Sequence, residues 1–184
     1  MKRLILALCL ALSVLCLVGP LQANPIVPGN PLWYEFRFSV VGVDATSGVG
    51  TIPSSGGNSV YAPDPPWTFT SALPVILTVT DAFLEGDAFN IFDFGSFIGA
   101  TSLVANTGND SGTDDPAVAL TIAALSHGFF SLPAGNHSLT IQPYQTVMEG
   151  AGFFRTDVVP LPGALLLFGS GLLGLIGLRR KLSS

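Results

Sequence analysis

The chain has 184 residues, of which 48% are hydrophobic and only 10% are charged. Apolar residues are concentrated at the two ends, and about 135 residues lie between them, enough for one domain with a core and too few for two. Residues 24–157 contain two arginines and twelve carboxylates, a formal charge of −10. So little positive charge excludes a nucleic-acid-binding protein, because phosphate recognition depends on basic side chains.

The first 23 residues have the organisation of a secretory signal peptide. A basic pair at residues 2–3 precedes an apolar stretch over residues 4–18, and small residues then lead to a cleavage site between Ala23 and Asn24. We expect signal peptidase to cut there. Both cysteines lie inside this segment, so the mature chain is expected to have no thiol, disulfide or thiolate metal site.

Alternating apolar and polar residues predict β-strands in the middle of the chain. The pattern is clearest after Trp33, where Tyr34, Phe36 and Phe38 alternate with polar residues. Turns rich in Gly, Pro, Asn and Asp separate the runs, which favours a mainly β domain over residues 24–157, an antiparallel β-sandwich or jelly-roll-like fold. The predicted strands are Trp33–Val43, Pro74–Thr80, Phe89–Phe94, Ile98–Val104, Phe129–Leu132, Ser138–Gln142 and Gly152–Val158.

Residues 115–125 are the one ambiguous stretch of the middle domain. Asp115 has the side chain of a helix cap, and Pro116 suits the first helical position. We expect a short helix or a loop here, between strands.

The middle domain carries no recognisable catalytic motif. Its two histidines, His127 and His137, each stand next to a serine, and neighbouring residues of a strand point to opposite faces. Both histidines are therefore expected to be surface or turn residues that make hydrogen bonds. A triad assembled from distant residues remains the alternative, but our expectation is a non-catalytic protein without a cofactor.

Calcium is the ion that the acidic turns favour best. Asp81, Glu85, Asp87 and Asp93 flank one turn, and a second acidic group occupies residues 109–115. Carboxylate oxygens suit Ca²⁺, which would act here as a structural ion that stabilises the fold. The alternative is that Asp and Gly simply form the turns, with side chains bonded to their own backbone.

Four aromatic residues allow two interpretations. Trp33, Tyr61, Trp67 and Tyr144 could provide faces for stacking sugars, which would make the domain a carbohydrate-binding module of an extracellular polysaccharide. The other interpretation is that they fill the core of the sandwich, where aromatic rings bury well. A secreted glycosidase or esterase is a third hypothesis, which requires a cleft with a carboxylate pair or a Ser-His contact.

The C-terminus combines a proline motif, an apolar run and a basic cluster. Residues 161–178 contain no charge, and eighteen helical residues span about 27 Å, enough for a membrane-crossing helix. The basic cluster that follows belongs on the cytoplasmic side, which places the middle domain outside that membrane. The motif is Val159, Pro160, Leu161, Pro162 and Gly163, and the basic cluster is Arg179, Arg180 and Lys181.

Residues 158–184, with this motif, span and basic cluster, resemble the PEP-CTERM protein-sorting signal. The motif at residues 159–163 resembles the variant subgroup with the sequence Val-Pro-Leu-Pro-Ala, with Gly163 in place of the alanine. The resemblance implies a Gram-negative bacterium and processing by an exosortase, a membrane-embedded cysteine transpeptidase. The precursor would be anchored transiently in the inner membrane with its domain in the periplasm, and then reach the cell surface or an extracellular polysaccharide matrix.

The middle domain also resembles a group of secreted β-sandwich proteins, over roughly residues 70–145. The shared features are a Thr-Asp strand end at residues 80–81, a Gly-Asp turn at residues 86–87 and a closing strand at residues 135–141. This resemblance implies the sandwich fold and a secreted setting, and it implies no activity.

Overall fold

The computed structural model describes residues 24–110 and 113–160. Two expected elements, the signal peptide over residues 1–23 and the membrane span over residues 161–178, lie outside them. Within the described ranges no helix is long and apolar enough to cross a bilayer. The described part thus corresponds to the segment between the two expected targeting signals.

Two mainly antiparallel sheets face each other as a β-sandwich, which confirms the expected class of fold. The β10 sheet has the spatial order β1 (Asn24–Pro25), β5 (Trp67–Ser71), β10 (Gly135–Gln145), β7 (Ala88–Asp93) and β8 (Ser96–Ala100). The β11 sheet has the order β3 (Thr46–Ser47), β2 (Trp33–Phe38), β11 (Gly150–Val158), β6 (Val75–Asp81) and β9 (His127–Leu132), and β4 (Ser59–Tyr61) pairs with β2. Two short pairings, β1 with β5 and β4 with β2, are parallel.

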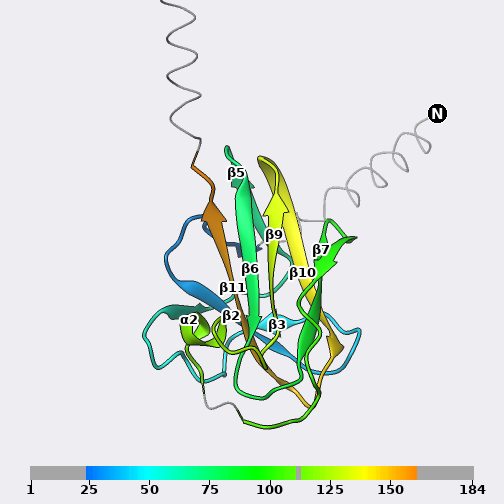
Figure 1. Cartoon of the computed structure of the whole chain (residues 1–184). Coiled ribbons are helices and arrows are strands. Elements are labelled where there is room, and N and C mark those ends of the chain that lie inside the picture. The colour runs from blue at the N-terminus through cyan, green and yellow to red at the C-terminus, as the bar shows by residue number, and fades with distance from the viewer. Residues whose placement is uncertain (1–23, 111–112, 161–184) are drawn as a thin grey trace, which may run out of the picture.

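β11 lies in the middle of its sheet although it is the last strand of the described chain. It pairs with β2 from Gly150 to Phe154 and with β6 from Gly152 to Val158. Figure 1 shows that β11 ends at the same end of the sandwich as the turns after β5 and β9. We call this the exit end. Because β2 and β6 meet only through β11, the sheet is complete only when β11 is present.

The core is built around aromatic rings contributed by both sheets. The ring centroid of Phe154 lies 4.7 Å from that of Trp67 and 5.3 Å from that of Tyr34. Phe36 meets Phe89 edge-on at 5.4 Å. Since each buried aromatic ring removes on the order of 150–250 Å² from water, these contacts are the main apolar link between the sheets.

The observed strands differ from the predicted ones mainly in their bounds. β2 ends at Phe38 instead of continuing to Val43, because the chain turns at Gly42, whose φ is +78°, and the valines around it are exposed. β8 begins at Ser96, ahead of the predicted Ile98. No strand was predicted where β5 forms. Its residues nevertheless alternate between buried and more exposed positions.

A short helix, α2 (Pro116–Ala119), follows the predicted cap. The Asp115 side chain accepts a hydrogen bond from the Ala117 backbone N–H at 2.9 Å, and Pro116 occupies the start of the helix. The Asn58 side chain also donates to Asp115, at 2.8 Å, and this bond holds the pKa of that carboxyl below its usual range. The helix expected between strands is therefore confirmed, together with its cap.

We predict that a chain of residues 24–160 folds alone, as a nearly all-β unit that needs no oxidation. A chain that ends at Glu149 keeps the other strands but lacks the one that joins β2 to β6, so it should lose cooperative unfolding. Far-UV circular dichroism and thermal melts of the two chains test this prediction. Equal cooperative melts would show that β11 is dispensable.

Candidate functional site

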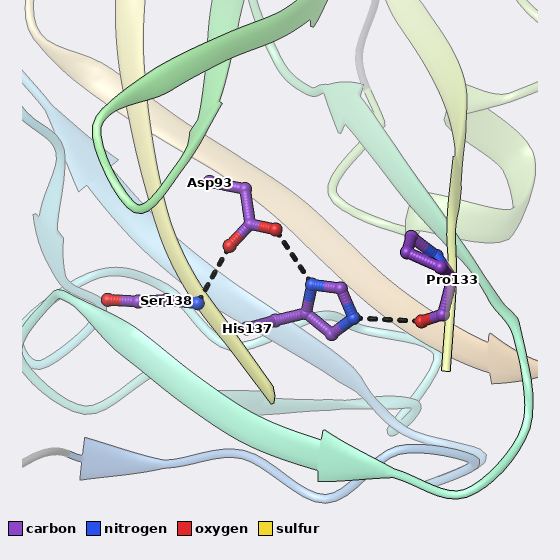
Figure 2. A network of polar contacts seen from close by, with 4 residues as sticks. All are labelled: Asp93, Pro133, His137 and Ser138. Carbon is purple, nitrogen blue, oxygen red and sulfur yellow. Dashed lines mark hydrogen bonds and ion pairs between the residues drawn. The ribbon is translucent and has the colours of Figure 1, made fainter. Parts of the chain in front are cut away.

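A buried histidine joins two strands and a turn of the β10 sheet near the exit end. His137 of β10 is 4% exposed, and its Nδ1 lies 2.7 Å from Oδ2 of Asp93, the last residue of β7. Its Nε2 lies 2.9 Å from the carbonyl oxygen of Pro133. Figure 2 shows Asp93 bridging the ring and the backbone N–H of Ser138, which donates to Oδ1 at 2.8 Å. The network fixes the β9–β10 turn to the end of β7.

Both ring nitrogens of His137 are engaged by groups that accept hydrogen bonds. A carboxylate and a carbonyl cannot donate, so the ring makes both bonds only when it is doubly protonated, and a neutral ring donates to one of them. The expectation of a surface or turn histidine is wrong for His137, because its side chain alternates inward with Leu139 and Ile141. The network joins the β9–β10 turn to β7 and β10, and no serine hydroxyl of the described residues takes part in it.

The second histidine has a weaker attachment. Nδ1 of His127, at the start of β9, lies 3.3 Å from the carbonyl oxygen of Leu125, and the side chain is partly buried. The hydroxyl of the adjacent Ser126 accepts a hydrogen bond from Thr101 instead. The backbone N–H of His127 donates to the Ser102 hydroxyl at 3.1 Å, but among the described residues neither histidine ring has a hydrogen bond to a serine hydroxyl.

Two buried carboxyl groups lie together at the end opposite the exit end. Asp81 is fully buried, and its Oδ1 accepts from the Ala82 N–H at 2.8 Å, whereas its Oδ2 has no hydrogen-bond partner. Burial, and then the nearby Asp87 carboxyl, raise the pKa of Asp81 to about 9. Asp87 accepts from the Val147 N–H at 2.9 Å, and burial raises its pKa as well. Near neutral pH, Asp81 therefore holds a proton.

A third buried carboxyl, Glu35, lies on the outer face of the β11 sheet. Burial is the largest effect on its pKa, which is raised. The nearby hydroxyls of Thr51 and Ser59 lower the pKa of Glu35, but less than burial raises it. Both carboxyl oxygens of Glu35 lack a hydrogen-bond partner, and the Thr51 hydroxyl donates to the Gly48 carbonyl at 2.7 Å. Nothing in the sequence indicated this burial except that Glu35 stands within a run of aromatic residues.

The four carboxylates predicted to bind calcium do not form one site. Asp81 and Asp87 are neighbours, but Glu85 accepts a hydrogen bond from the Thr107 hydroxyl at 2.6 Å on an exposed turn. Asp93 lies at the other end of β7, roughly 20 Å from Asp87 along an extended strand. Calcium needs six to eight oxygens around one point, and residues 24–110 and 113–160 contain no group of three His, Cys, Asp or Glu side chains that could hold a metal.

The four candidate sugar-stacking residues do not share an exposed surface. Trp33 and Trp67 are buried, and the Trp67 indole N–H donates to the Pro63 carbonyl at 2.8 Å. Tyr144 is partly buried and donates to a backbone carbonyl, which leaves Tyr61, at 40% exposure, as the accessible ring. For Trp67 the core interpretation is therefore the correct one, whereas Trp33 is buried in a separate cluster with Ala82 and Phe153.

The described surface has a hollow of about 430 Å³ beside Tyr61, lined also by Pro53, Ser59 and Val60, and two hollows at opposite ends of the sandwich. One, of about 320 Å³, lies beside Asp87 and is also lined by Arg37 and Glu149. The other, of about 580 Å³, lies between the first described residues and His137, and Thr68 and Asn136 contribute to its wall. The hollow beside His137 is also lined by Ser138, but the hydrogen-bond partners of the His137 ring are Asp93 and the Pro133 carbonyl, and not this serine hydroxyl.

The chain leaves the fold directly at the predicted sorting motif. Val158 still pairs with Val75 in the β11 sheet, and the Val159 N–H donates to the Pro74 carbonyl at 2.9 Å. The first motif residue is thus attached to the domain. The rest of the motif from residue 161 onwards, and the basic cluster at residues 179–181, lie outside the described residues.

Residues 158–181 match the family model of the PEP-CTERM protein-sorting motif. No curated protein and no solved structure matches the chain. The motif implies that the protein is exported, processed by an exosortase and sorted to the cell surface. The match begins at the last residue of β11 and reaches the end of the basic cluster.

We predict that His137→Ala lowers the free energy of unfolding by about 1–3 kcal/mol, because it leaves the Pro133 carbonyl and one Asp93 oxygen without a partner. The matched control is His127→Ala, which removes one long contact and should cost less than about 0.5 kcal/mol. Urea denaturation of both variants measures the difference. Equal losses would mean that the network at His137 has no special part in stability.

We also predict how the stability of the fold depends on pH through Asp81. Its folded-state pKa of about 9 exceeds its ordinary value of 3.8, so between these values the folded chain holds a proton that the unfolded chain releases. Stability should therefore fall as pH rises from about 4 to about 9, by up to roughly 1.4 kcal/mol per pH unit from this group. Asp81→Asn should flatten that slope, and Glu149→Gln, at an exposed position, should not. Denaturation midpoints at pH 5 and pH 8 decide between them, and identical slopes in the two variants would contradict the assignment.

Proposed function

We propose that the protein is a non-catalytic β-sandwich that an exosortase delivers to the cell surface or to an extracellular polysaccharide matrix of a Gram-negative bacterium. The observation that carries the proposal is the sorting motif at residues 158–181, which starts where the central strand β11 ends. The domain is then the cargo, and the segment after it is the signal that addresses the cargo.

A non-catalytic role is supported by how the candidate reactive groups are used. The two ring nitrogens of His137 lie within hydrogen-bonding distance of the Asp93 carboxylate and the Pro133 carbonyl. These contacts connect the β9–β10 turn to the end of β7. Asp81 is enclosed and fully buried, so it cannot reach a substrate without a change in the fold. The His137 network contributes to the stability of the sandwich.

The motif at residues 159–163 is the segment that we expect the exosortase to bind and cleave. Pro160 and Pro162 lack backbone donors, and each disfavours helix at the residue before it, so residues 159–163 favour an extended conformation. An extended segment is what a transpeptidase can admit to its active site. The apolar residues 161–178 and the basic cluster behind them would hold this segment at the membrane surface during cleavage.

We predict that alanines at Pro160, Leu161 and Pro162 together block processing, because the segment can then continue as helix. The precursor should stay membrane-bound and keep its C-terminal peptide, which ends at Ser184. Mass spectrometry of the C-terminal peptide checks this in cells with and without the exosortase. Pro53→Ala, a change at an exposed proline in a loop, is the control and should be processed normally.

The comparison between cells is the decisive part of that experiment. In the parent chain the peptide that ends at Ser184 should accumulate only when the exosortase is missing. If it is equally abundant in both kinds of cell, residues 159–181 are a plain anchor and the proposal fails.

A further inference from the structure

The spacer between the domain and the expected membrane span is very short. Val158 is the last strand residue, and the apolar segment begins at Leu161, so only Val159 and Pro160 lie between. The Cα atoms of Val158 and Leu161 are three steps apart along the chain, and an extended chain covers at most about 3.6 Å per step, which limits their separation to about 11 Å. The headgroup layer of one leaflet is itself roughly 5–8 Å thick. A part of the domain that projects two residues, about 7 Å, beyond Val158 therefore reaches this layer.

Two turns project beyond Val158 at the exit end. Val75 pairs with both Val158 and Leu132, so residues 72–74 and residues 133–134 lie further out than the last strand residue. Both turns carry exposed alanine and proline side chains, and neither contains a charge. We call these two turns, together with residues 159–160, the exit face.

The backbone of the exit face satisfies several of its polar groups within the protein. Leu73 bonds both its N–H and its carbonyl to the Ser71 hydroxyl, at 3.3 and 2.7 Å. The Pro74 carbonyl accepts from the backbone that follows β11, and the Pro133 carbonyl accepts from His137 at 2.9 Å. The prolines have no N–H to satisfy. Where water is scarce an unpaired backbone group is costly, and this arrangement lowers that cost.

The exit face is uncharged, whereas the opposite end of the sandwich is acidic. Nine residues of β11 separate the two ends by about 30 Å, well beyond a Debye length of about 8 Å. Nearer the exit face, Asp157 pairs with Arg155, and Asp93 is hydrogen-bonded to His137. The far end carries one base, Arg37, and four acids besides the protonated Asp81: Glu85, Asp87, Asp110 and Glu149.

We propose that the exit face rests in the lipid headgroup layer of the anchored precursor, with the acidic end pointing away from the membrane. A bilayer with anionic lipids would repel the acidic end and accept the uncharged one, so length and charge favour the same orientation. This inference rests on the proposed function, because it takes residues 161–178 to be inserted in the membrane.

The test uses residues 24–184, the expected precursor after removal of the signal peptide, which contains no cysteine, in vesicles of phosphatidylethanolamine and phosphatidylglycerol. A nitroxide is attached at Ala72→Cys, at Ala134→Cys or, as the far-end control, at the exposed Ala105→Cys. Electron paramagnetic resonance then measures collisions with a nickel chelate bound to lipid headgroups. We expect several-fold stronger relaxation at positions 72 and 134 than at position 105. Equal relaxation at the three positions overturns the inference while leaving the sorting function intact.

A charge placed on the exit face provides a second readout. Ala134→Glu should weaken the relaxation of the label at position 72, and Ala105→Glu should leave it unchanged. If the relaxation at position 72 appears only when the vesicles contain the exosortase, the enzyme covers this face and the lipid proposal is wrong. If the chain does not float with the vesicles at all, the anchor is absent, and the proposed function falls together with this inference.

Discussion

Phe154 lies where the two sheets meet, and it can lie there only because β11 passes between β2 and β6. Its ring contacts Trp67 of the opposite sheet and Tyr34 of the neighbouring strand. β2 and β6 belong to the same sheet, and they are joined to each other only through β11. The arrangement pairs residues near position 35 with residues near position 153, and such distant contacts form slowly because a long loop must close first. The β11 sheet therefore depends on β11 as the β10 sheet depends on β10, which joins β5 to β7.

This dependence links folding to export. The β11 sheet closes only when residues 150–158 are available, and the sorting motif starts at residue 158. The strand that completes the sheet is thus followed directly by the sorting motif. The Val159 N–H that bonds to Pro74 then fixes the start of the motif to the folded domain. In this architecture the exosortase meets a motif attached to a folded β-sandwich, with no flexible linker between.

The features that depend on local sequence were predictable, and those that depend on distant partners were not. The alternation of Tyr34, Phe36 and Phe38 predicted β2, and Asp115 with Pro116 predicted the start of α2. The sorting motif is also local, and the family model matches it. β5 was missed although Trp67–Ser71 alternates, because the Asp-Pro-Pro turn before it and its small polar residues resemble a loop.

The carboxylates show why the rest could not be predicted. An aspartate next to a glycine turn looks the same in sequence whether it binds an ion, caps its own backbone or pairs with a histidine 44 residues away, as Asp93 does. The pattern Gly-Asn-His-Ser-Leu-Thr-Ile did contain one usable signal, since His137 shares its strand face with Leu139 and Ile141. An inward histidine in an apolar core needs polar partners, and the nearby strand end supplies a carboxylate while the turn supplies a carbonyl. The buried ring of His137 thus lies between the Asp93 carboxylate and the Pro133 carbonyl, at the end of the domain next to the sorting motif.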